Sequence, residues 1–202
     1  MTRIKLCGLT RPCDIEAANR LKPDYIGFVF AKKSRRYVSP EQAEALKKQL
    51  SPEIRAVGVF VSEDPDTVAG LLNRGIIDLA QLHGSEDEAY LTRLRDLTDR
   101  PLLQAFRVAG EEDLHRAESS SADGILLDAG AGDGAVFDWK LLKGWSRPYF
   151  LAGGLEPGNV REAIRMLQPW GVDVSSGIET DGKKDPEKMA AFVTAVREED
   201  RT

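Results

Sequence analysis

Residues 149–154 read Tyr-Phe-Leu-Ala-Gly-Gly, a short apolar run that ends in two glycines. The same order of apolar strand, polar loop and capped amphipathic segment occurs about eight times along the chain. Most of the apolar runs lack strict alternation with polar residues, which is typical of parallel strands that are covered on both faces. The predicted strands span residues 4–6, 25–30, 56–61, 79–82, 102–108, 124–127, 149–152 and 171–174.

Several helix starts can be located from the sequence. Residues 39–42, Ser-Pro-Glu-Gln, combine an N-cap, a proline at the first helical position and a capping-box glutamine, and residues 85–88, Ser-Glu-Asp-Glu, predict a second capping box. Asp-Pro pairs at 64–65 and 185–186 predict two more helices. Few residues between 110 and 122 are apolar enough to face a core, so we expect the fifth helix to be short or missing.

Eight such units in 202 residues predict an α/β fold, a compact single (β/α)8 TIM barrel that spans residues 1–202 as one domain. A doubly wound open sheet is the alternative, and a dominant G-x-G-x-x-G turn after the first strand would favour it. Residues 7–10, Cys-Gly-Leu-Thr, do not have that form. The Gly-rich and charged turns follow many strands, as expected when every such loop contributes to one active face. We expect the charged tail, residues 197–202, to be frayed and solvated.

Composition excludes several classes of protein. The chain is 42% hydrophobic and 30% charged, and its apolar runs fall far short of the eighteen or so residues of a membrane helix, so we expect no contact with a membrane. The net charge of −5 argues against a nucleic-acid partner. Only two cysteines occur, six positions apart, which favours neither a disulfide nor a metal site. Together with an N-terminus that has no leader-like segment, this indicates a cytoplasmic protein.

In a TIM barrel, functional residues lie just after the strands. Cys7 ends the first strand and precedes a glycine that leaves its sulfur little local cover, and Asp128 closes the apolar run of the sixth. A thiol and a carboxylate across one barrel mouth would form a base and acid pair for moving protons on a substrate. The alternatives are an inert core thiol and a turn-forming aspartate.

Two loops are candidates for binding phosphate. They contain Gly153 and Gly154 after the seventh strand, and Ser175, Ser176 and Gly177 after the eighth. TIM barrels commonly bind phosphate in these two loops, through backbone N–H groups. Alternatively, the glycines only permit tight turns.

Two further positions follow strands. Residues 32–36 form a basic cluster in an acidic chain, which is either a solvated loop or a site where an arginine holds a carboxylate in two hydrogen bonds. His83 is either a structural histidine or a substrate-binding one. No spacing of Asp, Glu, His or Cys is typical of a metal site, and no nucleotide-binding loop is present.

Several motifs, in the same order along nearly the whole chain, resemble those of phosphoribosylanthranilate isomerase. They are residues 5–10 (Lys-Leu-Cys-Gly-Leu-Thr), 27–30 (Gly-Phe-Val-Phe), 33–37 (Lys-Ser-Arg-Arg-Tyr), 81–84 (Gln-Leu-His-Gly), 137–139 (Phe-Asp-Trp), 151–155 (Leu-Ala-Gly-Gly-Leu), 171–179 and 182–185. The resemblance implies a step of tryptophan biosynthesis: the Amadori rearrangement of N-(5-phosphoribosyl)anthranilate to 1-(2-carboxyphenylamino)-1-deoxyribulose 5-phosphate, without a cofactor.

The resemblance also implies roles for individual residues. Asp128 is the acid, Cys7 is the base, Arg36 binds the anthranilate carboxylate, and the two loops bind the phosphate. Asp173 contacts the sugar or orients its neighbours, and His83 belongs to the substrate-binding set.

One loop departs from the family pattern, because Asp133 stands where a hydroxyl residue is usual before Phe-Asp-Trp, and it would place a carboxylate near an anionic substrate. Two other functions remain open. One is the related aldose-ketose isomerisation of histidine biosynthesis, alone or as a dual activity, and the other is a sugar-phosphate-binding barrel without catalysis. The expected partner is a small phosphoribosyl compound, and either a monomer or a homodimer fits.

Overall fold

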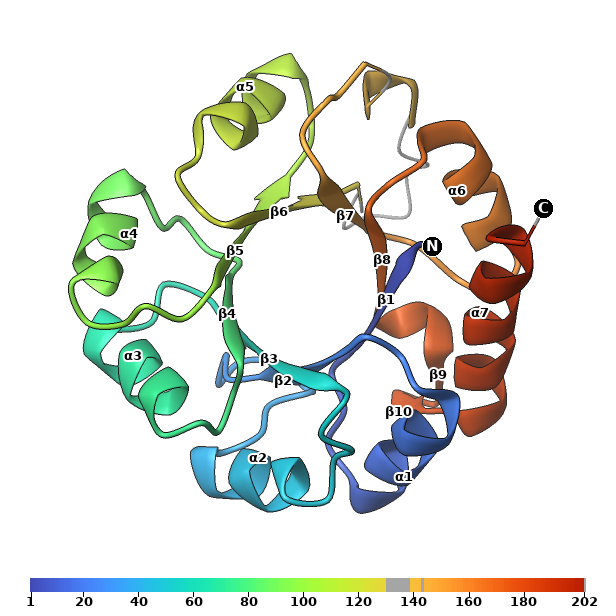
Figure 1. Cartoon of the computed structure of the whole chain (residues 1–202), viewed down its shortest axis with the longest axis horizontal. Coiled ribbons are helices and arrows are strands. Elements are labelled where there is room, and N and C mark those ends of the chain that lie inside the picture. The colour runs from blue at the N-terminus through green and yellow to red at the C-terminus, as the bar shows by residue number, and fades with distance from the viewer. Residues whose placement is uncertain (130–138, 143, 202) are drawn as a thin grey trace.

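Eight parallel strands close into a barrel in the computed structural model, which describes residues 1–129, 139–142 and 144–201 (Figure 1). Each strand pairs with the next in sequence, and β8 pairs with β1 to complete the ring. The predicted TIM barrel is therefore confirmed. The strands are β1 Arg3–Cys7, β2 Tyr25–Val29, β3 Arg55–Phe60, β4 Leu79–Leu82, β5 Leu102–Arg107, β6 Gly124–Asp128, β7 Tyr149–Ala152 and β8 Gly171–Val174.

Alternate residues of each strand face two different cores. Ile4 and Leu6 of β1 belong to the large core between the strands and the helices, whereas Val57, Leu103 and Leu126 fill the inside of the barrel. Both faces of the strands are thus buried, which explains why the apolar runs do not alternate in the sequence. The residues at the carboxyl ends of the strands remain available to form a site at one mouth of the barrel.

Seven α-helices of the described residues surround the ring, as Figure 1 shows. Ser39, Asp64 and Asp185 cap α2, α3 and α7 through their side chains, and a proline follows each of them, as the sequence predicts. The helices are α1 Pro12–Leu21, α2 Pro40–Lys47, α3 Pro65–Asn73, α4 Glu88–Arg95, α5 Glu111–Ser119, α6 Val160–Leu167 and α7 Pro186–Glu199.

The predicted capping box at residues 85–88 is wrong. Helix α4 begins at Glu88, and its N-cap is Asp87, whose carboxylate accepts a hydrogen bond from the backbone N–H of Tyr90. Glu86 is buried and accepts hydrogen bonds from the backbone N–H groups of Ser62 and Gly84, each at 2.7 Å. The Glu86 carboxylate therefore accepts from backbone donors of two different loops and does not take part in the start of the helix.

The segments after β5 and β6 bury few side chains of their own among the described residues. The prediction that the fifth helix is short or missing is wrong, because α5 has nine residues, one more than α2, α4 and α6. Only Ala117 of α5 is buried, which agrees with the few apolar residues in that stretch. Between β6 and β7, the described residues include a single 3-10 helix, η1 Trp139–Leu142.

The charged tail is tied to the barrel, so the prediction that residues 197–202 are frayed is wrong for its described part. Arg197 donates a hydrogen bond to the carbonyl of Thr2, and Asp200 accepts one from the Thr2 backbone N–H at 2.8 Å. No helix among the described residues is long and apolar enough to cross a membrane.

Candidate active site

Cys7 lies at the carboxyl end of β1 on the strand face that points into the barrel. Its register partner on β2 is Gly27, where a Cβ atom would lie only 2.6 Å from the Cys7 Sγ. The glycine thus makes room for the sulfur. With only 7% of its surface exposed, Cys7 is well covered, and the prediction that the sulfur would have little cover is wrong.

An ion pair lies beside Cys7 inside the barrel. Lys5, two residues earlier on the same face of β1, places its Nζ 2.9 Å from Oδ1 of Asp173 on β8. The Lys5 side chain is fully buried, and a buried ammonium group requires such a partner. Asp173 is therefore in contact with Lys5, and both roles that the sequence left open for it remain predictions.

Charges around Cys7 oppose one another. Burial raises the pKa of the Cys7 thiol, and Asp173 acts in the same direction, whereas the ammonium groups of Lys5 and Lys184 act to lower it. The balance of these effects is a raised pKa for the Cys7 thiol. This is opposite to the shift that a thiolate base requires near neutral pH.

Asp128 ends β6, and His83 follows β4. The two side chains meet at the barrel mouth, where His83 Nε2 lies 3.3 Å from Asp128 Oδ2. On its other side, His83 Nδ1 lies 3.2 Å from Nε2 of Gln81. If the Gln81 amide donates to Nδ1, the neutral ring carries its proton on Nε2 and donates it to Asp128. His83 is thus in contact with the predicted acid.

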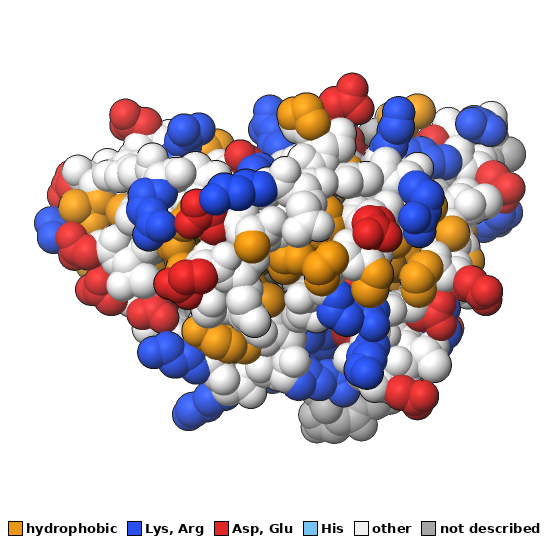
Figure 2. Space-filling model, turned by 90° about the horizontal axis from the view of Figure 1, so that it is seen from below, with side chains coloured by type: hydrophobic (Ala, Val, Ile, Leu, Met, Phe, Trp, Pro, Cys, Tyr) orange, Lys and Arg blue, Asp and Glu red, His pale blue; other side chains and the backbone are white. Residues whose placement is uncertain are grey.

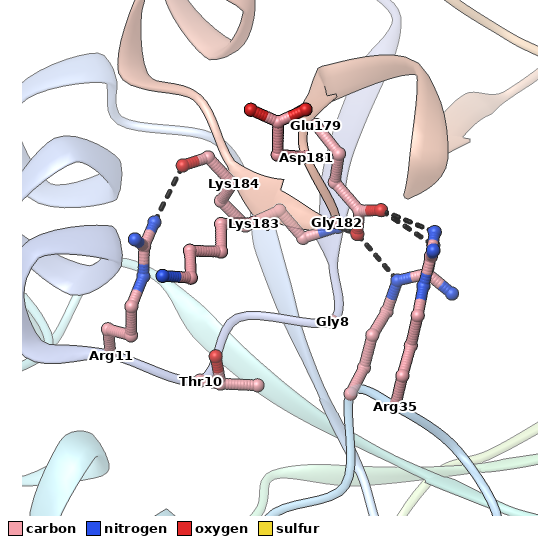
Figure 3. Close-up of a pocket in the computed structure, with 10 residues that line it drawn as sticks. Gly8, Thr10, Arg11, Arg35, Glu179, Asp181, Gly182, Lys183 and Lys184 are labelled. Carbon is pink, nitrogen blue, oxygen red and sulfur yellow. Dashed lines mark hydrogen bonds and ion pairs between the residues drawn. The ribbon is translucent and has the colours of Figure 1, made fainter.

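Arg36 is held in a defined position by a carboxylate. Its Nε and Nη2 donate to the two oxygens of Glu179 at 2.6 and 2.9 Å, and Arg35 donates to the same group at 2.8 Å (Figure 3). Lys184 Nζ lies 2.6 Å from Glu179 Oε1. Although burial opposes ionisation, hydrogen bonds from Arg36 and Lys184 lower the pKa of Glu179 to about 2. Glu179 is therefore ionised and bonds Arg35, Arg36 and Lys184.

A tight hairpin brings Glu179 and Lys184 together. Strands β9 Glu179–Thr180 and β10 Lys183–Lys184 pair in antiparallel register, with Lys184 opposite Glu179. Asp181 and Gly182 form the turn and both have positive φ, 52° and 74°, which is the conformation that an Asp-Gly turn of type I′ requires.

The described residues include a pocket of about 430 Å³ that opens beside these groups. Figure 3 shows basic side chains reaching it from the β1 loop, the β2 loop and the hairpin. Figure 2 shows Lys and Arg side chains at several places on the face it draws, with one larger group at its lower middle. Such a pocket suits an anionic ligand. It is lined by Gly8, Thr10, Arg11, Arg35, Arg36, Glu179, Asp181, Gly182, Lys183 and Lys184.

The two candidate phosphate loops lie against each other. Gly153 and Gly154 both have positive φ, 94° and 66°. Gly177 packs so closely on the carbonyl of Leu155 that a Cβ atom there would clash with it. Ser175 Oγ donates to the carbonyl of Cys7 at 3.2 Å, so the β8 loop also contacts the end of β1. Ser176 opens the short helix η2 Ser176–Ile178.

Sequence reasoning missed Lys5, Glu179 and Lys184 as site residues. A lysine flanked by Ile4 and Leu6 in a buried strand was a usable signal, because its charge requires a partner inside the fold. Glu179 and Lys184 lie in two of the family motifs, but no local physical signal assigned them a role. Asp133 lies outside the described residues, as does the rest of the segment 130–138. Among the residues that are described, no group of three or more His, Cys, Asp or Glu side chains could hold a metal ion.

Comparisons with known proteins agree on one family. Residues 4–195 match the family described as N-(5'-phosphoribosyl)anthranilate (PRA) isomerase. The N-(5'-phosphoribosyl)anthranilate isomerase of Acetivibrio thermocellus is 44% identical, over 99% of this chain and 98% of the relative, and that of Streptococcus gordonii is 45% identical over 98% and 99%.

Solved structures give the same result. The phosphoribosyl anthranilate isomerase of Thermotoga maritima superposes with a TM-score of 0.91 at 35% identity, covering 98% of this chain and all of the other. A phosphoribosyl anthranilate isomerase in complex with reduced 1-(o-carboxyphenylamino)-1-deoxyribulose 5-phosphate superposes with a TM-score of 0.88 at 36% identity, with the same coverage.

Proposed function

The chain belongs to the N-(5'-phosphoribosyl)anthranilate isomerase family, and we propose that it performs this family's reaction at its barrel mouth with Cys7 as base and Asp128 as acid. It is an isomerase of tryptophan biosynthesis that converts N-(5-phosphoribosyl)anthranilate into 1-(2-carboxyphenylamino)-1-deoxyribulose 5-phosphate. The observation that supports these roles most directly is the placement of the two side chains at the carboxyl ends of β1 and β6, with only β7 and β8 between these strands on one side of the ring.

The reaction needs two proton transfers. A proton donated to the furanose ring oxygen lets the C1–O bond break, which opens the ring and leaves an iminium between C1 and the anthranilate nitrogen. Removal of the C2 proton then gives an enolamine, which tautomerises to the C2 ketone. Asp128 donates the first proton, and the Cys7 thiolate accepts the second. Contact with His83 orients the Asp128 carboxyl group for its donation.

The remaining groups bind the two anionic ends of the substrate. Arg36, which Glu179 holds beside Gly8, binds the anthranilate carboxylate. The loops containing Gly153 and Gly154, and Ser175, Ser176 and Gly177, bind the phosphate, a proposal supported by their contact with each other. Asp173 acts by orienting Lys5. No cofactor is needed for this chemistry.

Three further proposals concern the chain as a whole. We propose that it works as one barrel domain, because pairing of β1 with β8 closes the ring. A cytoplasmic location fits its two free cysteines, which suit a reducing compartment. A Thermotoga maritima relative is described as dimeric, so sedimentation should show either a monomer or a homodimer.

Turnover tests the assignment. The fluorescence of the anthranilate-bearing substrate should decay when the protein is added, with or without a metal chelator. Cys7→Ala and Asp128→Asn should each lower kcat by about 10²- to 10⁴-fold, the range for a positioned proton-transfer group. Cys13→Ala is the control, because that thiol is exposed on α1. Near-normal kcat in Cys7→Ala would show that another group takes the C2 proton.

A further inference from the structure

Three cations and one carboxylate act on the Cys7 thiol. Lys5 belongs to β1 and Asp173 to β8, while Lys184 belongs to β10 and Arg36 to the loop after β2. Glu179 pairs with both Lys184 and Arg36. The five groups therefore leave one positive charge unbalanced, and a thiolate at Cys7 would balance it.

Lys5 is the cation best placed to act on the sulfur. Strand geometry puts residues two apart on the same face, so the Lys5 side chain and Cys7 both point into the barrel. Lys184 and Arg36 are each bonded to Glu179, whereas Lys5 Nζ donates to one oxygen of Asp173 at 2.9 Å. An ammonium group has three donors, so Lys5 can hold Asp173 and a thiolate together.

We propose that Lys5 is a positioning residue that makes Cys7 a base, with Asp173 holding its ammonium group in place. This proposal rests on the role of Cys7 proposed above. The thiol loses its proton to water before the substrate fills the mouth, and the resulting thiolate is stabilised by Lys5 until it accepts the C2 proton.

The protonation of Lys5 supports this role. Burial would favour the neutral amine, but the charges of Asp173 and Cys7 hold the pKa of Lys5 above its usual value. Lys5 is therefore charged at any pH at which the enzyme would work. Removing that charge should leave the buried thiol with the full effect of desolvation, so its pKa should rise further.

Alkylation of the ligand-free protein measures the thiolate without turnover. Iodoacetamide reacts with thiolates, and peptide mapping separates Cys7 from Cys13, which serves as an internal reference in the same molecule. The variant Lys5→Met should slow alkylation of Cys7 at pH 7 by about tenfold or more, since one pKa unit is tenfold in thiolate. Lys5→Arg should restore most of the rate, and Cys13 should react equally in all variants.

Two further variants separate this role from a structural one. Lys47→Met is the matched control, because Lys47 pairs with Asp78 on the outside of the ring and should leave alkylation of Cys7 unchanged. Lys5→Met alone leaves the Asp173 carboxylate buried without its partner and can therefore fail to fold. The double variant Lys5→Met with Asp173→Asn removes both charges, so it tests the same proposal in a protein that has no unpaired buried carboxylate. It should also slow alkylation of Cys7, though less than Lys5→Met alone.

The activity profile should follow the alkylation profile. The acid limb of kcat/KM should move to higher pH in Lys5→Met, a change that a loss of packing alone would not produce. A folded Lys5→Met protein or double variant in which Cys7 alkylates as fast as in the wild type would overturn the proposal. Failure of the proposed catalytic role would instead appear as normal turnover in Cys7→Ala, whatever the alkylation rates.

Discussion

The guanidinium group of Arg36 is held in place by the carboxylate of Glu179. Its guanidinium group has five N–H donors, and Glu179 accepts from Nε and Nη2. The Nη1 side points away from that pair and can bind a second carboxylate. Because Glu179 fixes the plane of the guanidinium group, binding of the substrate does not have to order a free side chain.

Substitution of the two neighbouring arginines should separate their roles. Arg36→Ala should weaken substrate binding by about 1.5–3 kcal/mol, the range for a hydrogen bond to a charged group. Arg35→Ala is the matched control, because Arg35 also bonds Glu179 but its side chain is 61% exposed. KM, or the Kd of a product analogue, measures both. An unchanged KM in Arg36→Ala together with a raised KM in Arg35→Ala would assign the substrate carboxylate to Arg35.

Glu179 should make stability depend on pH in the acid range. Its pKa is about 2 in the folded protein and about 4.5 in the unfolded chain. A carboxylate whose pKa falls on folding stabilises the protein above pH 4.5, and that contribution is lost as the pH falls from about 4.5 towards 2. Denaturant unfolding of Glu179→Gln should therefore show lower stability than the wild type at pH 7 and a smaller difference at pH 3. An equal difference at both pH values would contradict this.

At the scale of elements, the site depends on loops that pack on one another. The β8 loop lies against the chain after β7 because Gly177 has no side chain, and it lies against β1 through Ser175. A larger residue at 177 has to move backbone, since the atoms it meets are those of Leu155 and Glu156. The geometry of the proposed phosphate site is therefore sensitive to one Cβ atom.

Replacing a glycine by alanine at position 177, and at position 70 as a control, tests whether the proposed phosphate site depends on the packing of Gly177. Gly177→Ala should raise KM for the phosphorylated substrate and weaken competition by inorganic phosphate, because the β8 loop is displaced. Gly70→Ala, in α3 with open space around the added methyl group, should leave KM unchanged and stabilise the protein by about 0.5–1 kcal/mol. Steady-state kinetics with phosphate as inhibitor gives KM and the strength of phosphate competition, and denaturant unfolding gives the change in stability. Normal phosphate competition in Gly177→Ala would place the anion elsewhere.

Helix starts could be predicted from the sequence where neighbouring residues alone determine them. The starts of α2, α3 and α7 follow from an N-cap with a proline behind it, and tertiary contacts do not alter these starts. Residues 85–88 carry the same kind of local signal, but burial of Glu86 between two loops decides its partners. The site follows the same division. Cys7 and Asp128 could be placed by their strand ends, and the ion pair of Glu179 with Lys184 lies within the local hairpin of β9 and β10. The ion pair of Lys5 with Asp173 instead depends on β1 meeting β8 when the ring closes.

At the scale of the whole molecule, ring closure depends on the two ends of the chain. Strand β1 must pair with β8, and α7 packs over that junction, as Figure 1 shows. Arg197 of α7 bonds the carbonyl of Thr2 and the carboxylate of Asp24, which also bonds Arg3. The charged tail was predicted to be solvated because its partners at the N-terminus are almost two hundred residues away, beyond the reach of any local pattern.

Asp200 should therefore contribute to global stability although only two residues follow it in the sequence. Its carboxylate accepts from the backbone N–H and the hydroxyl of Thr2, and Thr2 is buried. Asp200→Ala leaves those donors unpaired and should cost about 1–3 kcal/mol. For a chain of this size each kcal/mol corresponds to about 2–4 °C in Tm. Arg201→Ala is the control, since that side chain is exposed. Thermal unfolding at pH 7 measures both variants, and equal Tm values for Asp200→Ala and Arg201→Ala would show that the tail does not help to hold the ring closed.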